Sequence, residues 1–270
     1  ACIFLDNIYI GTKDFWILKT SLLSPFSFEE IHPEGPLLNK PFSIKATPNN
    51  LWVTYGDYSV TFNPYPLDSY GISHLKNKKW INTSYLEVFD AKCLNAISVN
   101  PENFNQVFIS SFFSGLLEVN DEIPAVLYNE TNSGLESLIL PNDPNYIDIR
   151  VGASEFDNNG LLWTLTSRID KPLKSYNPAN NQWQSYSFTN LINNNNNNLG
   201  FGDLVIGSDN TKWVASYNYG LIGYNENNSS VKIKSLKDED ENMPAENVTA
   251  LAIDKRNQLW IGTSRGLRVL

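Results

Sequence analysis

A short pattern recurs along the chain: a polar turn is followed by an aromatic residue at the centre of an apolar strand. The aromatic residues at the six centres are Tyr9, Trp52, Phe108, Trp163, Trp213 and Trp260. Successive centres are separated by 43, 56, 55, 50 and 47 residues. Strand-built repeats of this length predict a β-propeller, in which each repeat is one four-stranded blade that packs on its neighbours.

The last repeat shows how one blade is built. Residues 247–253 alternate apolar and small side chains, and residues 258–263 and 267–270 form two further apolar stretches. The turns between them carry Asp, Asn and Gly, which bond their own backbone or accept a positive φ. Earlier repeats add a fourth, outer strand near Trp80 and Trp183. Five blades are therefore predicted to be complete, and the sixth to lack its outer strand.

The predicted fold class is all-β: a β-propeller of four-stranded blades, with six repeats visible in a six- or seven-bladed ring. No segment shows the periodicity of an amphipathic helix. Residues 1–270 are predicted to form a single β-propeller domain. Because the chain begins at Ala1 and ends within a repeat, we expect it to be an excerpt of a larger multidomain protein.

The charge balance narrows the classes of partner. The 270 residues carry a net charge of −9, and they contain no cluster of Lys and Arg. Such a chain is not expected to bind nucleic acid, because that binding depends on cationic surfaces. No run of 18 apolar residues occurs, so no membrane span is predicted in this chain.

Two cysteines, Cys2 and Cys93, lie in the first repeat and at the start of the third. Equivalent strands of blades that are not neighbours lie too far apart for a disulfide, whose Cα atoms must lie within about 7 Å. We therefore expect two free, mostly buried thiols. A redox pair is the alternative interpretation.

The run from Gln258 to Leu267, QLWIGTSRGL, resembles the two-component-regulator propeller repeat, and the segments around Trp163 and Trp213 resemble it less closely. This repeat is common in outer-membrane and periplasmic proteins of Bacteroidetes bacteria. The longer stretch 243–270 is most similar to PorZ-type proteins, which are cell-surface components of the type IX secretion machinery. The same repeat forms the periplasmic glycan-sensing region of hybrid sensor histidine kinases.

The sequence offers no visible catalytic constellation, so the chain is not predicted to be an enzyme. Its two histidines, His32 and His74, lie in different repeats without a Cys or carboxylate at metal-ligand spacing. No Gly-x-Ser-x-Gly or Walker-type loop occurs. The spacing of six residues from Asp254 to Trp260 also differs from the spacing of about five residues in sialidase boxes.

The acidic run 237–241 contains Asp238 and Asp240, which offer the oxygen ligands that Ca²⁺ prefers. The run lacks the alternating ligands and the glycine of a dedicated calcium loop. We therefore favour a solvated connecting loop, and we predict neither a metal nor a cofactor. The asparagine tract 193–198 is of low complexity and predicts a long loop.

Topology indicates where a binding site would lie. In a propeller, the turns between second and third strands and the connections between blades open on one face. The long connections on that face are residues 29–40, 129–146, 190–200 and 237–247. The shorter turns carry aromatic and arginine residues, which are enriched at binding hot spots. The candidate ligand-binding residues are Tyr55, Tyr58, Phe112, Phe113, Arg168, Tyr217, Tyr219 and Arg265. The alternative is that these side chains cap the ends of the blades.

The sequence shows no catalytic motif and therefore predicts non-catalytic recognition. The resemblance implies a location outside the cytoplasm, at the outer-membrane surface or in the periplasm. The resemblance implies a propeller of a PorZ-like component that helps attach cargo to anionic lipopolysaccharide. The partners would then be a glycan, anionic lipopolysaccharide or other secretion-machinery proteins. One alternative is the periplasmic glycan-sensing propeller of a hybrid two-component sensor. A propeller hydrolase or lyase is a third class, for which the sequence shows no acid–base pair.

Overall fold

The computed structural model describes every residue except 14–15, 32–33, 190, 193–199, 227–231 and 237–242. Within the described residues all regular secondary structure is β-strand, which confirms the predicted all-β class. The strands form six antiparallel sheets, and strands that follow one another in sequence are hydrogen-bonded neighbours in each sheet. The six sheets correspond to the six sequence repeats.

Each of the first three sheets has four strands. The first comprises β1 (Cys2–Phe4), β2 (Asn7–Gly11), β3 (Ile17–Ser21) and β4 (Ser24–Ile31). The second comprises β5 (Ser43–Thr47), β6 (Asn50–Thr54), β7 (Ile72–Lys76) and β8 (Lys79–Thr83). The third comprises β9 (Leu94–Asn100), β10 (Asn103–Ser111), β11 (Gly115–Asn120) and β12 (Ile123–Tyr128).

The next two sheets also have four strands, and the last has three, as the sequence predicted. The fourth comprises β13 (Val151–Phe156), β14 (Leu162–Thr166), β15 (Leu173–Asn177) and β16 (Gln182–Tyr186). The fifth comprises β17 (Phe201–Ile206), β18 (Lys212–Ser216), β19 (Leu221–Asn225) and β20 (Lys232–Leu236). The sixth comprises β21 (Val248–Ile253), β22 (Leu259–Thr263) and β23 (Gly266–Val269).

The repeated aromatic residues occupy equivalent positions in the six sheets. Tyr9, Trp52, Phe108, Trp163, Trp213 and Trp260 lie on β2, β6, β10, β14, β18 and β22, the second strand of each sheet. Each residue therefore has a hydrogen-bonded strand on both sides, as its place in a four-stranded meander requires. The strand register predicted from the repeat is confirmed.

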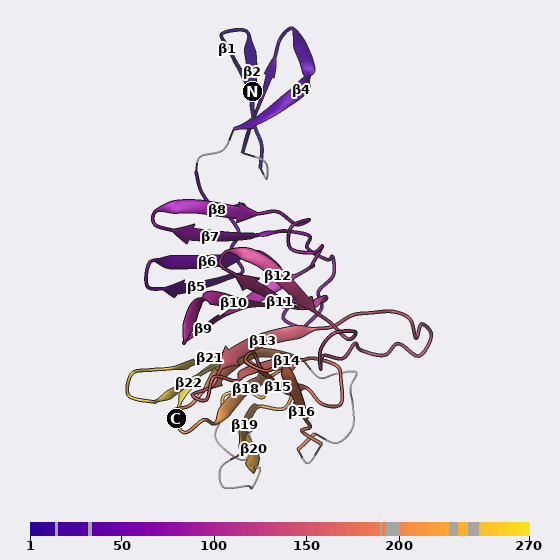
Figure 1. The fold of residues 1–270 in the computed structure, drawn as a ribbon, viewed down its shortest axis with the longest axis vertical. Coiled ribbons are helices and arrows are strands. Elements are labelled where there is room, and N and C mark those ends of the chain that lie inside the picture. The colour runs from indigo at the N-terminus through magenta and orange to yellow at the C-terminus, as the bar shows by residue number, and fades with distance from the viewer. Residues whose placement is uncertain (14–15, 32–33, 190, 193–199, 227–231, 237–242) are drawn as a thin grey trace.

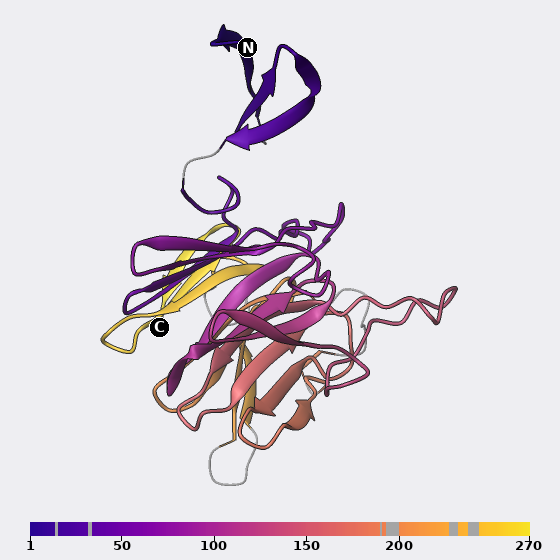
Figure 2. The same ribbon diagram turned by 45° about the horizontal axis from the view of Figure 1, so that its top comes forward.

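The first strands of the second to sixth sheets lie around a common axis. Neighbouring sheets contact one another in sequence order, from the β5–β8 sheet to the β21–β23 sheet, through β5, β9, β13, β17 and β21 (Figure 2). Lys45 on β5 also reaches Glu155 on β13, with Nζ 3.1 Å from Oε2, although these sheets are not sequence neighbours. This ion pair shows that the first strands face one another across the axis.

The β1–β4 sheet lies apart from the other five sheets (Figures 1 and 2). Its apolar side chains are accordingly exposed, and Leu23 and Phe26 keep 92% and 94% of their surface in solvent. The other five sheets bury most of their large apolar side chains between blades. The number of blades in a closed ring stays a prediction.

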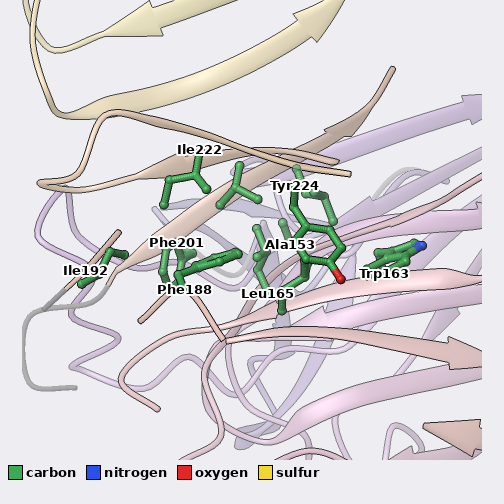
Figure 3. Packing of buried hydrophobic residues seen from close by; sticks show 11 residues of the cluster. Ala153, Trp163, Leu165, Phe188, Ile192, Phe201, Ile222 and Tyr224 are labelled. Carbon is green, nitrogen blue, oxygen red and sulfur yellow. The ribbon is translucent and has the colours of Figure 1, made fainter. Parts of the chain in front are cut away.

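The packing between blades is clearest between the fourth and fifth sheets (Figure 3). Trp163 and Leu165 on β14 pack there with Phe201 on β17 and with Ile222 and Tyr224 on β19. The ring centroids of Trp163 and Tyr224 lie 5.8 Å apart, and Trp163 is fully buried. A buried aromatic side chain of this size removes about 150–250 Å² from water, so these residues dominate the contact between the sheets.

In the fourth and sixth repeats an aspartate of the turn is hydrogen-bonded to the tryptophan of the second strand. The carboxylate of Asp157 accepts hydrogen bonds from the backbone amides of Asn159 and Leu161 at 2.9 and 3.0 Å. Its other oxygen accepts a hydrogen bond from Trp163 Nε1 at 2.8 Å. Nζ of Lys212, on the next sheet, lies over the Trp163 ring at 4.1 Å from its centroid and forms a cation–π contact with it.

The same arrangement recurs in the last sheet. Asp254 accepts hydrogen bonds from the amides of Arg256 and Gln258 at 2.8 and 2.9 Å, and from Trp260 Nε1 at 3.3 Å. The spacing of six residues from aspartate to tryptophan therefore places the carboxylate within hydrogen-bond distance of the indole. It closes the turn and fixes the indole in one orientation, because each ring has a single donor.

Both cysteines are free, as predicted, but their burial differs. Cys93 is buried at the entrance to the third sheet, and burial raises the pKa of its thiol to about 11. Cys2 is exposed, so the prediction of a buried thiol is wrong for this residue. The physical reason is that β1 belongs to the sheet that stands apart and has no neighbouring blade to cover it.

We predict that a thiol reagent such as DTNB at pH 8 will label Cys2 quickly and Cys93 slowly. A thiol reacts through its thiolate, which both burial and a pKa of about 11 make scarce for Cys93. Absorbance should report one reactive thiol in the native protein and two in denaturant. Cys2→Ser is the matched control and should remove the fast phase; a fast phase that persists would contradict the assignment.

We predict that Trp163→Ala will lower the free energy of unfolding by about 3–5 kcal/mol, because it leaves a cavity between two sheets. Trp260→Ala should cost roughly half as much, since the Trp260 ring is only half-buried. Urea denaturation followed by tryptophan fluorescence and circular dichroism measures both losses. Equal losses would show that the last sheet is packed as tightly as the middle of the structure.

Candidate functional site

A long loop from the second sheet covers one end of the axis. Residues 55–71 connect β6 to β7 and carry Tyr58 and Phe62, whose ring centroids lie 5.4 Å apart. Tyr58 also stacks on Phe112, which follows β10, at 4.3 Å. Its hydroxyl donates a hydrogen bond to the carbonyl of Gly202 on β17 at 3.3 Å. The loop therefore joins the second, third and fifth sheets at this end of the molecule.

Two glycines allow the loop to pack closely on the fifth sheet. A Cβ atom at Gly200 would lie 2.6 Å from Cγ of Phe62, and one at Gly202 would lie 2.9 Å from Cε1 of Phe62. Carbon atoms do not approach this closely without strain, so any larger residue would displace the phenyl ring. The glycines thus set the position of Phe62 over the axis.

Three of the eight candidate residues take part in this packing. Phe112 is fully buried, and Tyr55 is buried with its hydroxyl donating to Ser73 Oγ at 2.5 Å. Tyr58 lies between Phe62 and Phe112, and burial raises the pKa of its hydroxyl. These side chains stabilise the ends of the blades and present little surface to a ligand.

A pocket with a volume of about 460 Å³ opens beside the loop. It is lined by Thr61, Phe62, Asn63, Tyr65, Arg150, Ser167, Arg168, Gly200, Tyr217 and Asn218. Arg150 and Gly200 immediately precede the first strands of their sheets, and the other residues belong to turns between second and third strands. The structure therefore brings both kinds of loop together on one face, as the topology predicted.

Of the sequence candidates, Arg168 and Tyr217 line this pocket. The sequence reasoning missed Phe62, Tyr65 and Arg150. The length of the connection at residues 55–71 could have indicated the first two, because the equivalent turns of the other repeats are much shorter. No repeat feature indicates Arg150, because it lies just before β13 rather than in a turn.

Arg150 forms the rigid part of the pocket floor. The side chain is buried, and its Nε and Nη2 donate to the Asp148 carboxylate at 2.9 and 2.7 Å. Its Nη1 donates to the backbone carbonyl of Phe62 at 3.2 Å. Asp148 neutralises the guanidinium charge, and the three hydrogen bonds fix the guanidinium against the loop from the second sheet.

Arg168 differs from Arg150 in its surroundings. It lies on the turn after β14, it is half-buried, and its φ of 63° places it in the left-handed region. Its Nε is buried without a hydrogen-bond partner among the described residues. Burial lowers the pKa of the guanidinium, and the nearby charge of Arg150 lowers it further. Arg168 is thus a desolvated cation in a strained backbone position, a combination found at binding sites.

Aromatic residues form the rim on the side of the third sheet. The hydroxyls of Tyr65 and Tyr146 are hydrogen-bonded, and the candidate Phe113 contacts both rings edge-on at 6.4 Å. Lys92 lies 5.5 Å from the Phe113 ring centroid. Tyr146 belongs to the loop between β12 and β13, which projects from the body (Figure 1). Phe113 therefore lies at the rim and not among the residues that line the pocket.

The remaining two candidates, Tyr219 and Arg265, do not line the pocket either. Tyr219 is half-buried and packs against the cluster between the fourth and fifth sheets. Arg265 is exposed on the turn between β22 and β23, where its backbone amide donates a hydrogen bond to Thr263 Oγ1 at 3.3 Å.

The described residues include no group of three or more His, Cys, Asp or Glu that could hold a metal ion. His74 stacks on Trp52 with ring centroids 3.9 Å apart, and burial lowers the pKa of its imidazole. It is therefore a core residue of the second sheet. His32, Asp238, Asp240 and the asparagine tract 193–198 lie outside the described residues.

Residues 242–265 match the family model of the two component regulator propeller. The matched segment contains Asp254 and Trp260, which are hydrogen-bonded to each other at the turn between β21 and β22. The fold of this chain is also similar to the folds of solved propeller structures. A comparison of the sequence with curated proteins finds no match.

PorZ, a bacterial surface component of the type IX secretion system of Porphyromonas gingivalis, has a similar structure, with a TM-score of 0.76 and 19% identity. The similarity covers 95% of this chain and 36% of that protein. The extracellular domain of the putative hybrid two component system BT4673 from B. thetaiotaomicron is also similar, with a TM-score of 0.60 and 16% identity. That match covers 99% of this chain and 32% of that domain.

The chain thus spans about a third of the length of these two structures. At such low identity the similarity shows that the folds agree. No helix among the described residues is long and apolar enough to cross a membrane.

We predict that Asp148→Asn will lower the free energy of unfolding by about 3–5 kcal/mol, because it leaves the buried guanidinium of Arg150 without a counter-charge. Thermal and urea unfolding measure the loss. Replacing both residues, as in Asp148→Asn with Arg150→Met, should recover part of it, since no uncompensated charge is then buried. A double variant as unstable as the single one would show that geometry, not charge, dominates at this position.

Proposed function

We propose that this chain is a recognition propeller of a PorZ-like cell-surface component, which helps attach cargo to anionic lipopolysaccharide. Two observations support the proposal. The fold agrees with that of PorZ over 95% of this chain. The pocket at the end of the axis presents the half-buried guanidinium of Arg168, whose Nε has no hydrogen-bond partner among the described residues, in a protein whose net charge is −9. The second observation carries the proposal, because it offers a specific place for an anionic group.

The pocket suits binding better than catalysis. Its lining consists of arginine, aromatic, amide and hydroxyl side chains, together with one glycine. General acid–base chemistry needs a titratable group within hydrogen-bond reach of the substrate. The nearest carboxylate to Arg150, that of Asp148, already accepts hydrogen bonds from this guanidinium. We therefore propose a non-catalytic role for the face that carries the pocket.

The proposal includes a location and a parent protein. An extracytoplasmic location, at the outer-membrane surface or in the periplasm, is consistent with the surface and extracellular character of the similar structures. We further propose that residues 1–270 are one propeller domain from a larger multidomain protein. Its partners would be a glycan, anionic lipopolysaccharide or other secretion-machinery proteins.

The alternative function is the periplasmic glycan-sensing propeller of a hybrid two-component sensor. The similarity to the extracellular domain of BT4673, with a TM-score of 0.60, favours this alternative. The same face would then bind a glycan whose presence is signalled across the membrane. The two functions differ in the parent protein, because a sensor continues into a membrane-spanning helix and a kinase.

Titration of purified anionic lipopolysaccharide and of neutral polysaccharides against the chain tests the proposed function. We expect lipopolysaccharide to bind, and Tyr217→Ala to weaken binding by about 5- to 30-fold, equivalent to about 1–2 kcal/mol from one aromatic contact. Surface plasmon resonance measures the affinities, and circular dichroism confirms the fold.

The matched control is Asn49→Ala, which changes a turn on the opposite face and should leave the affinity unchanged. Tight binding of a neutral glycan alone would favour the sensor alternative. Binding of neither kind of glycan would contradict both functions.

A further inference from the structure

We infer that the pocket between Arg168, Phe62 and Tyr217 binds the carboxylate of one acidic sugar residue, with Arg168 as its anchor. The inference rests on the proposed function, since it assigns a ligand group to the same face. The ligand group is a carboxylate with one negative charge, and Arg168 is the residue that holds it.

The charge of the pocket sets the charge of the ligand. Two of the lining residues, Arg150 and Arg168, are charged. Arg150 contributes +1 and its bidentate partner Asp148 contributes −1, so these two cancel. Arg168 then leaves a net charge of +1. A single carboxylate would balance this charge, whereas a phosphate monoester would bring about 1.5–2 negative charges beside Asp148.

One nitrogen of the Arg168 guanidinium lacks the hydrogen-bond partner that such an atom normally has. Its Nε is buried and forms no hydrogen bond within the described part of the chain. A half-buried guanidinium nitrogen without a hydrogen-bond partner is unfavourable, and a bound carboxylate would supply that partner. Guanidinium and carboxylate groups form paired, parallel hydrogen bonds, which makes this anion the best geometric match.

The turn that carries Arg168 is held in place before any ligand binds. The Ser167 amide donates to the Arg150 carbonyl at 2.8 Å, and the Phe201 amide donates to Ser167 Oγ at 3.0 Å. These bonds fix the turn against the fourth and fifth sheets, and they maintain the left-handed backbone at Arg168. A preorganised cation loses less entropy on binding than a flexible surface arginine.

The walls of the pocket suit the ring of a sugar. Phe62 and Tyr217 meet edge-on with centroids 5.8 Å apart, so the pocket has aromatic surface beside its cation. Aromatic rings pack against the CH-bearing face of a pyranose, while the amides of Asn63 and Asn218 can serve its hydroxyls. The volume of about 460 Å³ lies within the range of about 300–1,000 Å³ for small-ligand sites.

Isothermal titration calorimetry with methyl glucuronoside, its methyl ester and methyl glucoside 6-phosphate tests the inference. The ester differs from the acid by one methyl group and by the loss of one negative charge. We expect the acid to bind at one site per chain, and the ester to bind at least about tenfold more weakly. We expect the phosphate to bind more weakly than the acid. Raising the salt concentration should weaken binding of the acid and leave binding of the uncharged ester unchanged, because salt screens charge.

Variants of Arg168 identify the anchor. Arg168→Gln should weaken binding of the acid at least about tenfold, and Arg168→Lys should be intermediate because it keeps the charge but loses the planar fork. Arg168→Asn provides a second neutral variant whose residue adopts the left-handed backbone readily. Arg256→Gln is the charge-matched control, since Arg256 is exposed on a turn of the opposite face and should not affect binding.

Equal affinity for the acid and the ester would overturn the inference, as would unchanged binding by both neutral variants. So would tighter binding of the phosphate, or no binding of any of the three compounds. An acidic peptide that binds as tightly as the acidic sugar would reassign the pocket to a protein partner. If lipopolysaccharide binds Arg168→Gln and the wild type equally, the proposed function stands and the pocket assignment falls. If the acidic sugar binds but lipopolysaccharide does not, the reverse holds.

Discussion

Packing of one sheet against the next is the interaction on which the rest of this structure depends. A four-stranded sheet has an apolar face that it cannot bury alone, so stability comes from neighbouring sheets. The second-strand aromatic supplies much of the buried surface, and the turn aspartate holds the indole in place at Trp163 and Trp260. Because the same contact repeats, the first strands face a common axis and the connecting loops gather on one face.

The sequence predicts the local part of this arrangement well. The spacing of the aromatic residues gives the strand register, because strand periodicity and turn chemistry act over a few residues. It gives the three-stranded last sheet for the same reason. It does not predict that the β1–β4 sheet stands apart, because each repeat looks alike whether or not a neighbour covers it. The exposure of Cys2 follows from that difference.

The candidate site was predictable only in outline. The face and two of its lining residues, Arg168 and Tyr217, follow from propeller topology. The loop at residues 55–71 has no counterpart in the other repeats, so comparison between repeats gives no expectation for its path. Its aromatic residues close the axis and form a wall of the pocket through contacts with distant sheets. Contacts between distant sheets form only in the assembled fold, so the local sequence pattern of one repeat does not predict them.

The same assembly would allow an acidic protein to offer the proposed anion a favourable site. At an ionic strength of 0.15 M, charges on exposed loops are screened beyond about 8 Å, so the net charge matters less than the nearest groups. Here the Asp148 carboxylate is hydrogen-bonded to Arg150, and Nε of Arg168 has no hydrogen-bond partner among the described residues. The lining comes from the second, fourth and fifth sheets, so an anion seated there would contact all three. By linkage, a ligand at 100 times its dissociation constant would add about 2.7 kcal/mol to the stability of that arrangement. Occupation of the pocket would therefore stabilise the placement of the blades, and the packing between blades would in turn set how well the pocket binds.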